Sequence, residues 1–244
     1  MGPMPPQTPL VSLVLVTMRP SFLPAICAML DRQTYAHTEL VVVLHGHEVI
    51  GLLPDERLAL ESARAVLEMP SSRSLGHCLN AAIAESRGIF VAKIDDDDLY
   101  GREYLAEMVG HLLAEDGDVV GKAEIYVYLE ESGTVVLRKP GASLKTVKFV
   151  AGATLAFSRS LALQCPFRDV ASRAGAYFLE DSRINGATAY STSRRNFMCV
   201  RRAAMDGHTW RLPDNAFIEN GIVLRRHRHA TRAELLAMID ERVA

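Results

Sequence analysis

The chain has 244 residues, of which 49% are hydrophobic, and a formal net charge of −2 at pH 7. This length and composition suit a globular protein with a sizeable buried core, and no apolar run approaches the roughly 20 residues of a transmembrane helix. Because acidic and basic residues nearly balance, the chain has no overall basic field, and nucleic acid is not favoured as a partner.

The first half of the chain alternates short apolar runs with amphipathic stretches. Residues 1–9 carry no basic residue and no apolar core, so we expect a flexible leader rather than a signal peptide. Ser21 is expected to cap the first helix. Strands are expected over 11–16, 40–44, 66–69 and 89–94, and further helices over 55–64 and 75–86. This alternation of strands and helices predicts a parallel α/β sheet.

The second half is expected to be richer in strands and less regular. Residues 105–112 have the apolar spacing of an amphipathic helix, whereas 119–129 and 134–137 have the composition of strands. Thr231 and Glu234 form the capping-box pattern that opens a C-terminal helix. The four cysteines are far apart and lack the paired spacing of metal ligands, so we expect reduced thiols in a cytoplasmic protein.

Four consecutive carboxylates, Asp95–Asp98, directly follow the apolar run 89–94. Two ionised carboxylates about 4 Å apart repel by roughly 4 kcal/mol at an effective dielectric near 20, so a fold that clusters them usually supplies a cation. Mg2+ or Mn2+ is the natural partner, because these ions bind carboxylate oxygens together with substrate phosphates. Ligands of α/β sheets also bind at strand carboxyl ends. The run therefore predicts a metal-assisted site, with a solvated acidic turn as the alternative.

Two other classes of protein place acids in a similar way. Haloacid-dehalogenase-type phosphotransferases carry Asp-x-Asp after an apolar strand and use the first Asp as nucleophile, but the strand in this chain is the fourth, not the first. A calcium loop starting at Asp95 would place Tyr100 at the required glycine and Ala106 at the terminal glutamate. The phosphotransferase is kept as an alternative, and the calcium module is disfavoured.

Several ordered segments resemble the family 2 glycosyltransferases, which are nucleotide-sugar enzymes with the GT-A fold. The resemblance covers about residues 10 to 212 and rests on segments in that family's order and approximate spacing: 11–20, Gln33-Thr34-Tyr35, 39–43, Asn80-Ala81-Ala82-Ile83, Arg87-Gly88 and 93–100. It implies a GT-A-like, Rossmann-type mixed α/β sheet flanked by helices. The nucleotide-binding half would cover about 10–122, the acceptor half about 123–225, and a basic segment and helix 226–244.

In that family the acidic loop is the Asp-x-Asp motif. The resemblance implies that Asp95 and Asp96 face the ribose and phosphates of the donor, and that Asp97, with Asp95, binds Mg2+ or Mn2+. Asp98 would support the loop. A bound cation would stabilise the negative charge that gathers on the diphosphate as the glycosidic bond breaks.

A second similar feature is the segment 177–181, at the position where the family carries the Asp that deprotonates the acceptor hydroxyl. Asp181 is the candidate general base, and Glu180 is the second candidate. An inverting displacement needs one carboxylate opposite the leaving diphosphate to accept the proton of the nucleophile. The alternative is that both acids lie in the first turn of a helix, where its dipole stabilises them.

A third feature, Gly207-His208-Thr209-Trp210, resembles the His-Thr-Trp ending of a subset of these transferases. His208 would then complete the metal or diphosphate site, the alternative being a hydrogen-bonded structural histidine. Trp210 is either a core anchor or an aromatic floor for the sugar or the acceptor.

Donor recognition departs from the family pattern. Thr17 and Arg19 match the family's first nucleotide-contact loop, but Leu44-His45 stands where many members carry an acidic pair that reads uracil. His45 is therefore a candidate contact to the base, the alternative being an exposed turn histidine, and uridine specificity is not implied. Arg73 is the candidate substitute for the arginine that relatives often place at the position of Leu79.

These features predict a metal-dependent, inverting glycosyltransferase that moves a sugar from a nucleotide-diphosphate donor to a glycan, lipid-linked or small-molecule hydroxyl acceptor. Its role would be in bacterial surface-glycan or glycoconjugate assembly. A non-catalytic nucleotide-sugar binding protein is a further alternative. Residues 225–229 form a basic run that is either solvated, covers the diphosphate, or brings the protein into peripheral contact with an acidic lipid surface.

Overall fold

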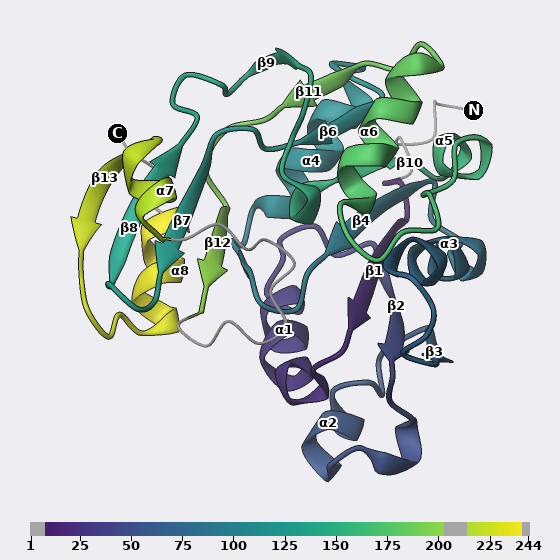
Figure 1. Ribbon diagram of the computed structural model, residues 1–244. Coiled ribbons are helices and arrows are strands. Elements are labelled where there is room, and N and C mark those ends of the chain that lie inside the picture. Colours follow the sequence, from purple (N-terminus) through teal and green to yellow (C-terminus); the bar gives the residue numbers. More distant parts are fainter. Residues whose placement is uncertain (1–7, 203–213, 241–244) are drawn as a thin grey trace, which may run out of the picture.

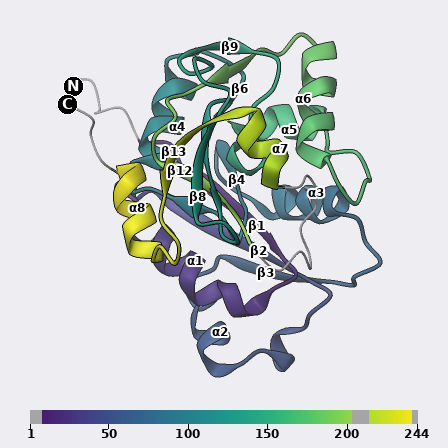
Figure 2. The same cartoon turned by 60° about the vertical axis from the view of Figure 1, so that its left-hand side comes forward.

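The computed structural model describes residues 8–202 and 214–240, so the predicted leader lies largely outside it. The strands of these residues form two sheets (Figure 1). The larger has the order β3-β2-β1-β4-β10-β6-β11-β9, and the smaller has the order β13-β8-β7-β12-β5. Helices lie on both sides of the larger sheet (Figure 2). This is the mixed sheet flanked by helices that the sequence predicts.

Four neighbouring parallel strands form one half of the larger sheet: β1 (Val11–Thr17), β2 (Thr38–His45), β3 (Ala65–Met69) and β4 (Phe90–Ile94). Their pairing confirms the parallel arrangement expected from the sequence. Because parallel strands end at the same side of a sheet, the loops that follow these strands lie together there. We call this side the carboxyl edge.

The helices that connect these strands are α1 (Leu23–Leu30), α2 (Pro54–Leu58) and α3 (Leu75–Glu85), with the short turns η1 (Pro20–Phe22) and η2 (Val49–Gly51). Two predictions were wrong here. Ser21 does not cap α1, because it lies inside the 3-10 turn η1, and Phe22 is the N-cap. The helix expected over 55–64 is shorter, because Arg64 already donates its backbone N–H to Leu40 O (2.8 Å) and leads into β3.

The acidic loop leads into β5 (Leu99–Tyr100) and then α4 (Tyr104–Leu113). The single strand expected over 119–129 is two strands, β6 (Val119–Gly121) in the larger sheet and β7 (Ile125–Leu129) in the smaller. Between them Lys122 is fully buried, with its ammonium 2.8 Å from the Glu107 carboxylate. The chain changes sheets at this buried ion pair, which apolar patterning alone did not indicate.

The rest of the described chain completes both sheets. Its elements are β8 (Thr134–Arg138), β9 (Lys145–Val147), η3 (Gly152–Thr154), β10 (Ala156–Ser158), α5 (Arg159–Gln164), α6 (Ala174–Ile184), β11 (Ala189–Ser191), β12 (Phe197–Arg201), α7 (Asp214–Glu219), β13 (Gly221–Arg226) and α8 (Arg232–Asp240). β10 runs antiparallel to β4 and β6, which makes the larger sheet mixed. The capping box at Thr231 and Glu234 is confirmed by reciprocal hydrogen bonds.

The larger sheet has a buried core on each face. Successive β1 side chains point to opposite faces, so Leu13 and Leu15 join the core with α1 and α4, while Val14 joins the core with α3 and α6. Figure 2 shows α1, α4 and α8 on one side of the strands and α3, α5 and α6 on the other. In the part of the chain that the structure describes, no helix is long and apolar enough to cross a bilayer.

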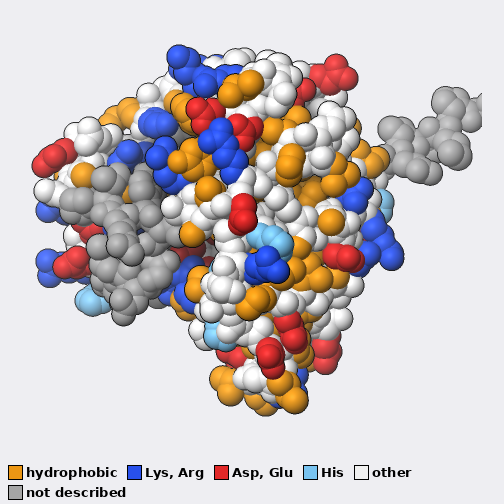
Figure 3. All heavy atoms as spheres, turned by 45° about the vertical axis from the view of Figure 1, so that its right-hand side comes forward, with side chains coloured by type: hydrophobic (Ala, Val, Ile, Leu, Met, Phe, Trp, Pro, Cys, Tyr) orange, Lys and Arg blue, Asp and Glu red, His pale blue; other side chains and the backbone are white. Residues whose placement is uncertain are grey.

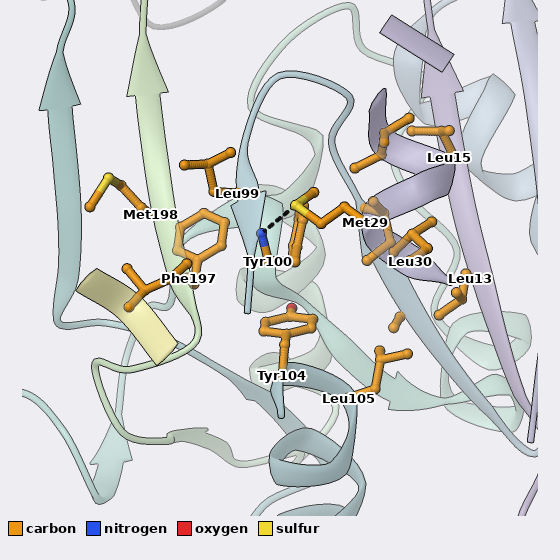
Figure 4. Close-up of a cluster of buried hydrophobic side chains, with 14 of the residues drawn as sticks. Leu13, Leu15, Met29, Leu30, Leu99, Tyr100, Tyr104, Leu105, Phe197 and Met198 are labelled. Atoms are coloured by element: carbon orange, nitrogen blue, oxygen red, sulfur yellow. Dashed lines mark hydrogen bonds between the residues drawn. The ribbon is translucent and has the colours of Figure 1, made fainter. Parts of the chain in front are cut away.

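Aromatic side chains of β5, α4 and β12 pack together next to Met29 of α1 (Figure 4). The Tyr100 ring lies edge-on to Tyr104, with ring centroids 4.9 Å apart, and 5.4 Å from the Phe197 ring. The backbone N–H of Tyr100 points at the Met29 sulfur, 3.2 Å away. Because Tyr100 follows the acidic loop almost directly, this packing fixes the end of that loop.

Candidate functional site

Four loops meet at the carboxyl edge of the larger sheet and carry most of the predicted site residues. Thr17 donates its hydroxyl to the Asp96 carboxylate at 2.5 Å, and Arg19 forms an ion pair with the same carboxylate. At the end of β2, His45 Nε2 lies 2.9 Å from the carbonyl oxygen of Arg73. The fold therefore joins the β1 loop to the acidic loop, and the end of β2 to the loop before α3.

Two of the four acidic side chains are buried and tied to the protein. Desolvation raises the pKa of Asp96, although its hydrogen bond with Arg19 acts in the opposite direction. Asp98 accepts the backbone N–H of Val200 at 3.0 Å. Burial, together with the charges of the neighbouring acids, raises the pKa of Asp98 well above its usual range. The contact with Val200 fits the supporting role expected for Asp98. The contacts with Thr17 and Arg19 hold Asp96 inward as well.

The other two acids are more accessible. The Asp97 side chain is 15% exposed, and one of its oxygens lies 2.9 Å from the Arg19 guanidinium. The Asp95 side chain is 37% exposed and pairs with Lys93. The accessible carboxylates of the loop are thus the two that the resemblance assigns to the metal.

These two carboxylates suit a hard divalent cation that takes further ligands from elsewhere. Within residues 8–202 and 214–240, no three His, Cys, Asp or Glu side chains are placed to hold a metal ion by themselves. At nucleotide sites, Mg2+ is usually held by one or two carboxylates while substrate phosphates and waters complete the shell. Asp97 and Asp95 supply that number of oxygen donors. A cation at Asp97 would compete with Arg19 for the same carboxylate.

Tyr100 anchors the acidic loop, a role that the sequence analysis missed. Its hydroxyl accepts the backbone N–H of Asp95 at 2.8 Å and donates to the carbonyl oxygen of Ala153, also at 2.8 Å. Ala153 belongs to η3, so the bridge holds the start of β10 beside the acidic loop. The signal in the sequence was Tyr100, the aromatic residue two positions after the last aspartate.

The predicted base lies past the middle of α6. Asp181 pairs with Arg168 through two hydrogen bonds of 2.8 and 2.5 Å, and Glu180 lies 3.5 Å from the same guanidinium. The alternative that both acids occupy the first turn of a helix is therefore wrong, because α6 begins at Ala174. Figure 3 shows acidic and basic side chains side by side on this face of the molecule.

The amino end of α6 lies against η3. A Cβ atom built on Gly175 would lie 3.1 Å from Gly152 Cα. Asp181 is six residues further along the helix, which corresponds to about 9 Å at 1.5 Å per residue. The candidate base is thus set back along α6 from the point where this helix meets the loops at the carboxyl edge.

Asn80, one of the residues behind the family resemblance, has a structural role here. Its side-chain amide donates to the carbonyl oxygen of Phe167 at 2.8 Å and accepts the Phe167 N–H at 2.9 Å. This pair of bonds ties α3 to the segment between α5 and α6, which also carries Arg168. The segment therefore depends on Asn80 for its position.

Replacing Asn80 by Ala is expected to lower the free energy of unfolding by about 1–3 kcal/mol, because it leaves a backbone donor and a backbone acceptor without their partner. Urea unfolding followed by circular dichroism measures this loss. The matched control is Asn220→Ala, which removes a local bond to Ala216 O on an exposed helix end. A loss no larger than that of the control would show that the Asn80 bonds do not hold the segment.

A separate cavity of about 790 Å3 has no residue of the acidic loop in its lining. Its lining comes from α4, α8 and the loops before β7, β9 and β12, and it includes Glu107, Glu124 and Arg194. None of the residues predicted for the site lines it. Two further predicted residues, His208 and Trp210, lie outside the described part of the chain.

Comparisons with known proteins identify the fold. No protein-family model and no curated protein sequence matches the chain. Among solved structures, the mannosyltransferase PcManGT from Pyrobaculum calidifontis, in complex with GDP-Man and Mn2+, is 19% identical with a TM-score of 0.63, and the alignment covers 84% of this chain and 60% of that one. S. aureus TarS 1-349, in complex with UDP-GlcNAc, is 16% identical with a TM-score of 0.59, over 86% of this chain and 63% of that one.

The chain thus spans somewhat less than two thirds of the length of these neighbours. The alignments nevertheless cover most of this chain. The chain therefore has the GT-A-type fold of the glycosyltransferases.

Proposed function

We propose that the protein is a metal-dependent, inverting glycosyltransferase that moves a sugar from a nucleotide-diphosphate donor to a hydroxyl acceptor. The single observation that supports this most is the connection of the β1 loop to the acidic loop through Thr17, Arg19 and Asp96, at the carboxyl edge of a GT-A-type fold. In open α/β sheets that edge is where ligands bind. On the strength of the sequence resemblance, we propose a role in bacterial surface-glycan or glycoconjugate assembly.

In this proposal the residues of the acidic loop divide their work. Asp97 and Asp95 would hold Mg2+ or Mn2+, which when bound stabilises the charge on the departing diphosphate. Asp96 keeps Thr17 and Arg19 in place, and Arg19 presents a guanidinium that suits phosphate oxygens. PcManGT, the neighbour with the same fold, is in complex with Mn2+, which supports a divalent metal here.

Asp181 is the proposed general base, with Glu180 as the second candidate. A carboxylate that accepts the acceptor's proton must reach the attacking oxygen at hydrogen-bond distance. In this structure both acids face Arg168, so Asp181 must release at least one of its bonds to Arg168 when it takes the proton. Arg168 is exposed, and solvent screens its attraction for the acids, so this release is inexpensive.

The base of the donor is left open by the neighbours, one of which is in complex with GDP-Man and the other with UDP-GlcNAc. His45 is 8% exposed and its ring nitrogen is engaged by the Arg73 carbonyl. We therefore propose that His45 acts by positioning the loop that carries Arg73.

Replacing His45 by Ala is expected to weaken binding of uridine, guanosine, thymidine and cytidine diphosphates by a similar factor of about 2 to 10, the value of one hydrogen bond. Competition against a labelled nucleotide measures the four affinities. The control is His37→Ala, at the opposite end of β2, which should leave all four unchanged. A change in the order of preference among the bases would instead show that His45 reads the base.

The proposed function is tested by incubating the protein with nucleotide-sugar donors, Mn2+ and a panel of hydroxyl acceptors, and measuring release of the nucleoside diphosphate. Acceptor-dependent release supports transfer. Release of inorganic phosphate from simple phosphomonoesters would instead support a phosphotransferase. Tight donor binding without any turnover would support a non-catalytic binding protein.

A further inference from the structure

The outer strand of the smaller sheet leaves three consecutive apolar side chains exposed. β13 pairs with β8 at the edge of this sheet, and Figure 1 shows it at the periphery of the molecule. Ile222, Val223 and Leu224 are 49%, 38% and 44% exposed. Neighbouring side chains on a strand point to opposite faces, so both faces of β13 are open here. Single exposed apolar residues are ordinary, but three in a row are not.

A basic run continues directly from these apolar residues. Residues 225–229 contain three arginines and two histidines and no acid. We call 222–229 the β13 strip. Arg225, Arg226 and Arg228 are exposed, and none of them forms an ion pair with another described residue. The strip is held to the sheet through its backbone, because His227 N–H donates to Gly133 O at 2.6 Å.

Three acidic residues lie near the strip and offset part of its charge: Glu234, and Glu130 and Glu131 of the turn whose Gly133 adjoins Arg228. Hydrogen bonds from Thr231 lower the pKa of Glu234, and the positive charge of Arg225 acts in the same direction. The carboxylate of Glu234 accepts the hydrogen bonds of the capping box at the start of α8. Within residues 222–229 themselves, the charged side chains are all basic and they adjoin an exposed apolar segment.

We propose that the β13 strip docks the protein on an anionic lipid surface. Apolar side chains that enter the boundary between headgroups and acyl chains add affinity in proportion to the area they bury. Each arginine near an anionic membrane adds about 1 kcal/mol, an effect that falls off with ionic strength. Ile222, Val223 and Leu224 supply the first contribution, and the arginines of the strip supply the second.

The same features disfavour a second copy of the chain as the occupant. Pairing of two β13 strands across a two-fold axis near Arg225 would bring the arginines of one copy close to those of the other, and like charges across strands are destabilising. The pairing register of β13 also shifts between Val223 and Arg225. Bulges and charged residues are the devices that protect sheet edges from such pairing. The inference does not rest on the proposed sugar transfer, because no site residue lies in the strip.

Co-sedimentation with lipid vesicles tests the proposal on the full chain. We expect binding to vesicles of phosphatidylcholine mixed with phosphatidylglycerol, weaker binding as salt is raised, and none to phosphatidylcholine alone. The double variant Arg225→Gln, Arg226→Gln should lose about 30-fold in affinity, from about 1 kcal/mol per arginine. The double variant Ile222→Ser, Leu224→Ser should lose at least about 10-fold, because less apolar surface is buried.

The matched control is Lys145→Gln with Lys148→Gln, which removes two exposed basic residues at and beside β9, on the edge of the other sheet. This variant should bind the mixed vesicles like the parent chain, and thermal unfolding should confirm that all three variants are folded. Equal loss in the control would show that only overall charge matters and would overturn the proposal. Failure of the chain to bind anionic vesicles would also overturn the proposal. This holds whether the chain is monomeric or forms a dimer that the double variant Ile222→Ser, Leu224→Ser dissociates.

Discussion

Replacing Asp97 by Ala is expected to abolish the Mn2+ dependence of donor binding and to slow sugar transfer by at least about 100-fold. Asp97 is an accessible carboxylate of the acidic loop and is the proposed metal ligand. A bound metal contributes several kcal/mol by stabilising the leaving diphosphate. Calorimetry of nucleoside diphosphate binding, with and without Mn2+, measures the first effect. The fold should persist, because Arg19 keeps its pairing with Asp96.

Glu131→Ala is the matched control for Asp97→Ala, since it removes an exposed acid from the turn between β7 and β8, in the other sheet. It should leave the Mn2+ dependence intact. Unchanged nucleotide affinity and unchanged Mn2+ dependence in Asp97→Ala would show that Asp97 does not hold the metal.

Replacing Asp181 by Asn is expected to reduce sugar transfer by about 100-fold to 10,000-fold while donor affinity is retained, because the amide keeps the volume of the side chain but cannot accept a proton. Slow hydrolysis of the donor by water should persist, since departure of the diphosphate does not need this base. Transfer kinetics together with nucleotide binding separate the two effects. Glu180→Gln should be milder.

The ion pair with Arg168 makes a second variant necessary, because Asp181→Asn also weakens that pair. Arg168→Ala removes the pair and leaves the Asp181 carboxylate in place. If Asp181 is the base, Arg168→Ala should keep most of the activity. If Asp181 only positions Arg168, both variants should lose transfer to the same extent. Full activity in Asp181→Asn, with loss only in Glu180→Gln, would reverse the two roles.

The parallel half of the fold could be predicted from sequence because its signal is local. The runs that form β1 and β4 are apolar at nearly every position, as strands buried on both faces must be. Adjacent strand ends then place Thr17 and Asp96 near each other. Their contact of 2.5 Å follows from this geometry.

The second half depended on contacts that no local pattern contains. The chain leaves the larger sheet after β6 at Lys122, which is buried against Glu107, a partner fifteen positions earlier in the sequence. Burial lowers the pKa of Lys122 in spite of that partner. A charged residue within an apolar stretch looked like an ordinary strand position, so the expected strand 119–129 ran straight through the point where the sheets divide.

Some residues that support the family resemblance have a structural role and take no part in the proposed reaction. Glu39 accepts hydrogen bonds from the Ser12 hydroxyl and from the N–H groups of Arg87 and Gly88. A Cβ atom on Gly88 would lie 2.6 Å from the backbone nitrogen of Ser12, so only glycine fits there. These segments secure the amino ends of the strands.

The candidate base was harder to interpret, because its partner Arg168 comes from an irregular segment.

The most direct measurement of the central claim is a thermal-shift screen of nucleoside diphosphates with and without Mn2+. A ligand at 100 times its dissociation constant stabilises the folded state by about 2.7 kcal/mol, which corresponds to roughly 5 °C or more in a chain of this size. We expect such a shift for at least one nucleoside diphosphate, only with the metal present, and its loss in Asp97→Ala. No shift with any nucleoside diphosphate, or an equal shift without metal, would contradict a metal-dependent nucleotide-sugar site.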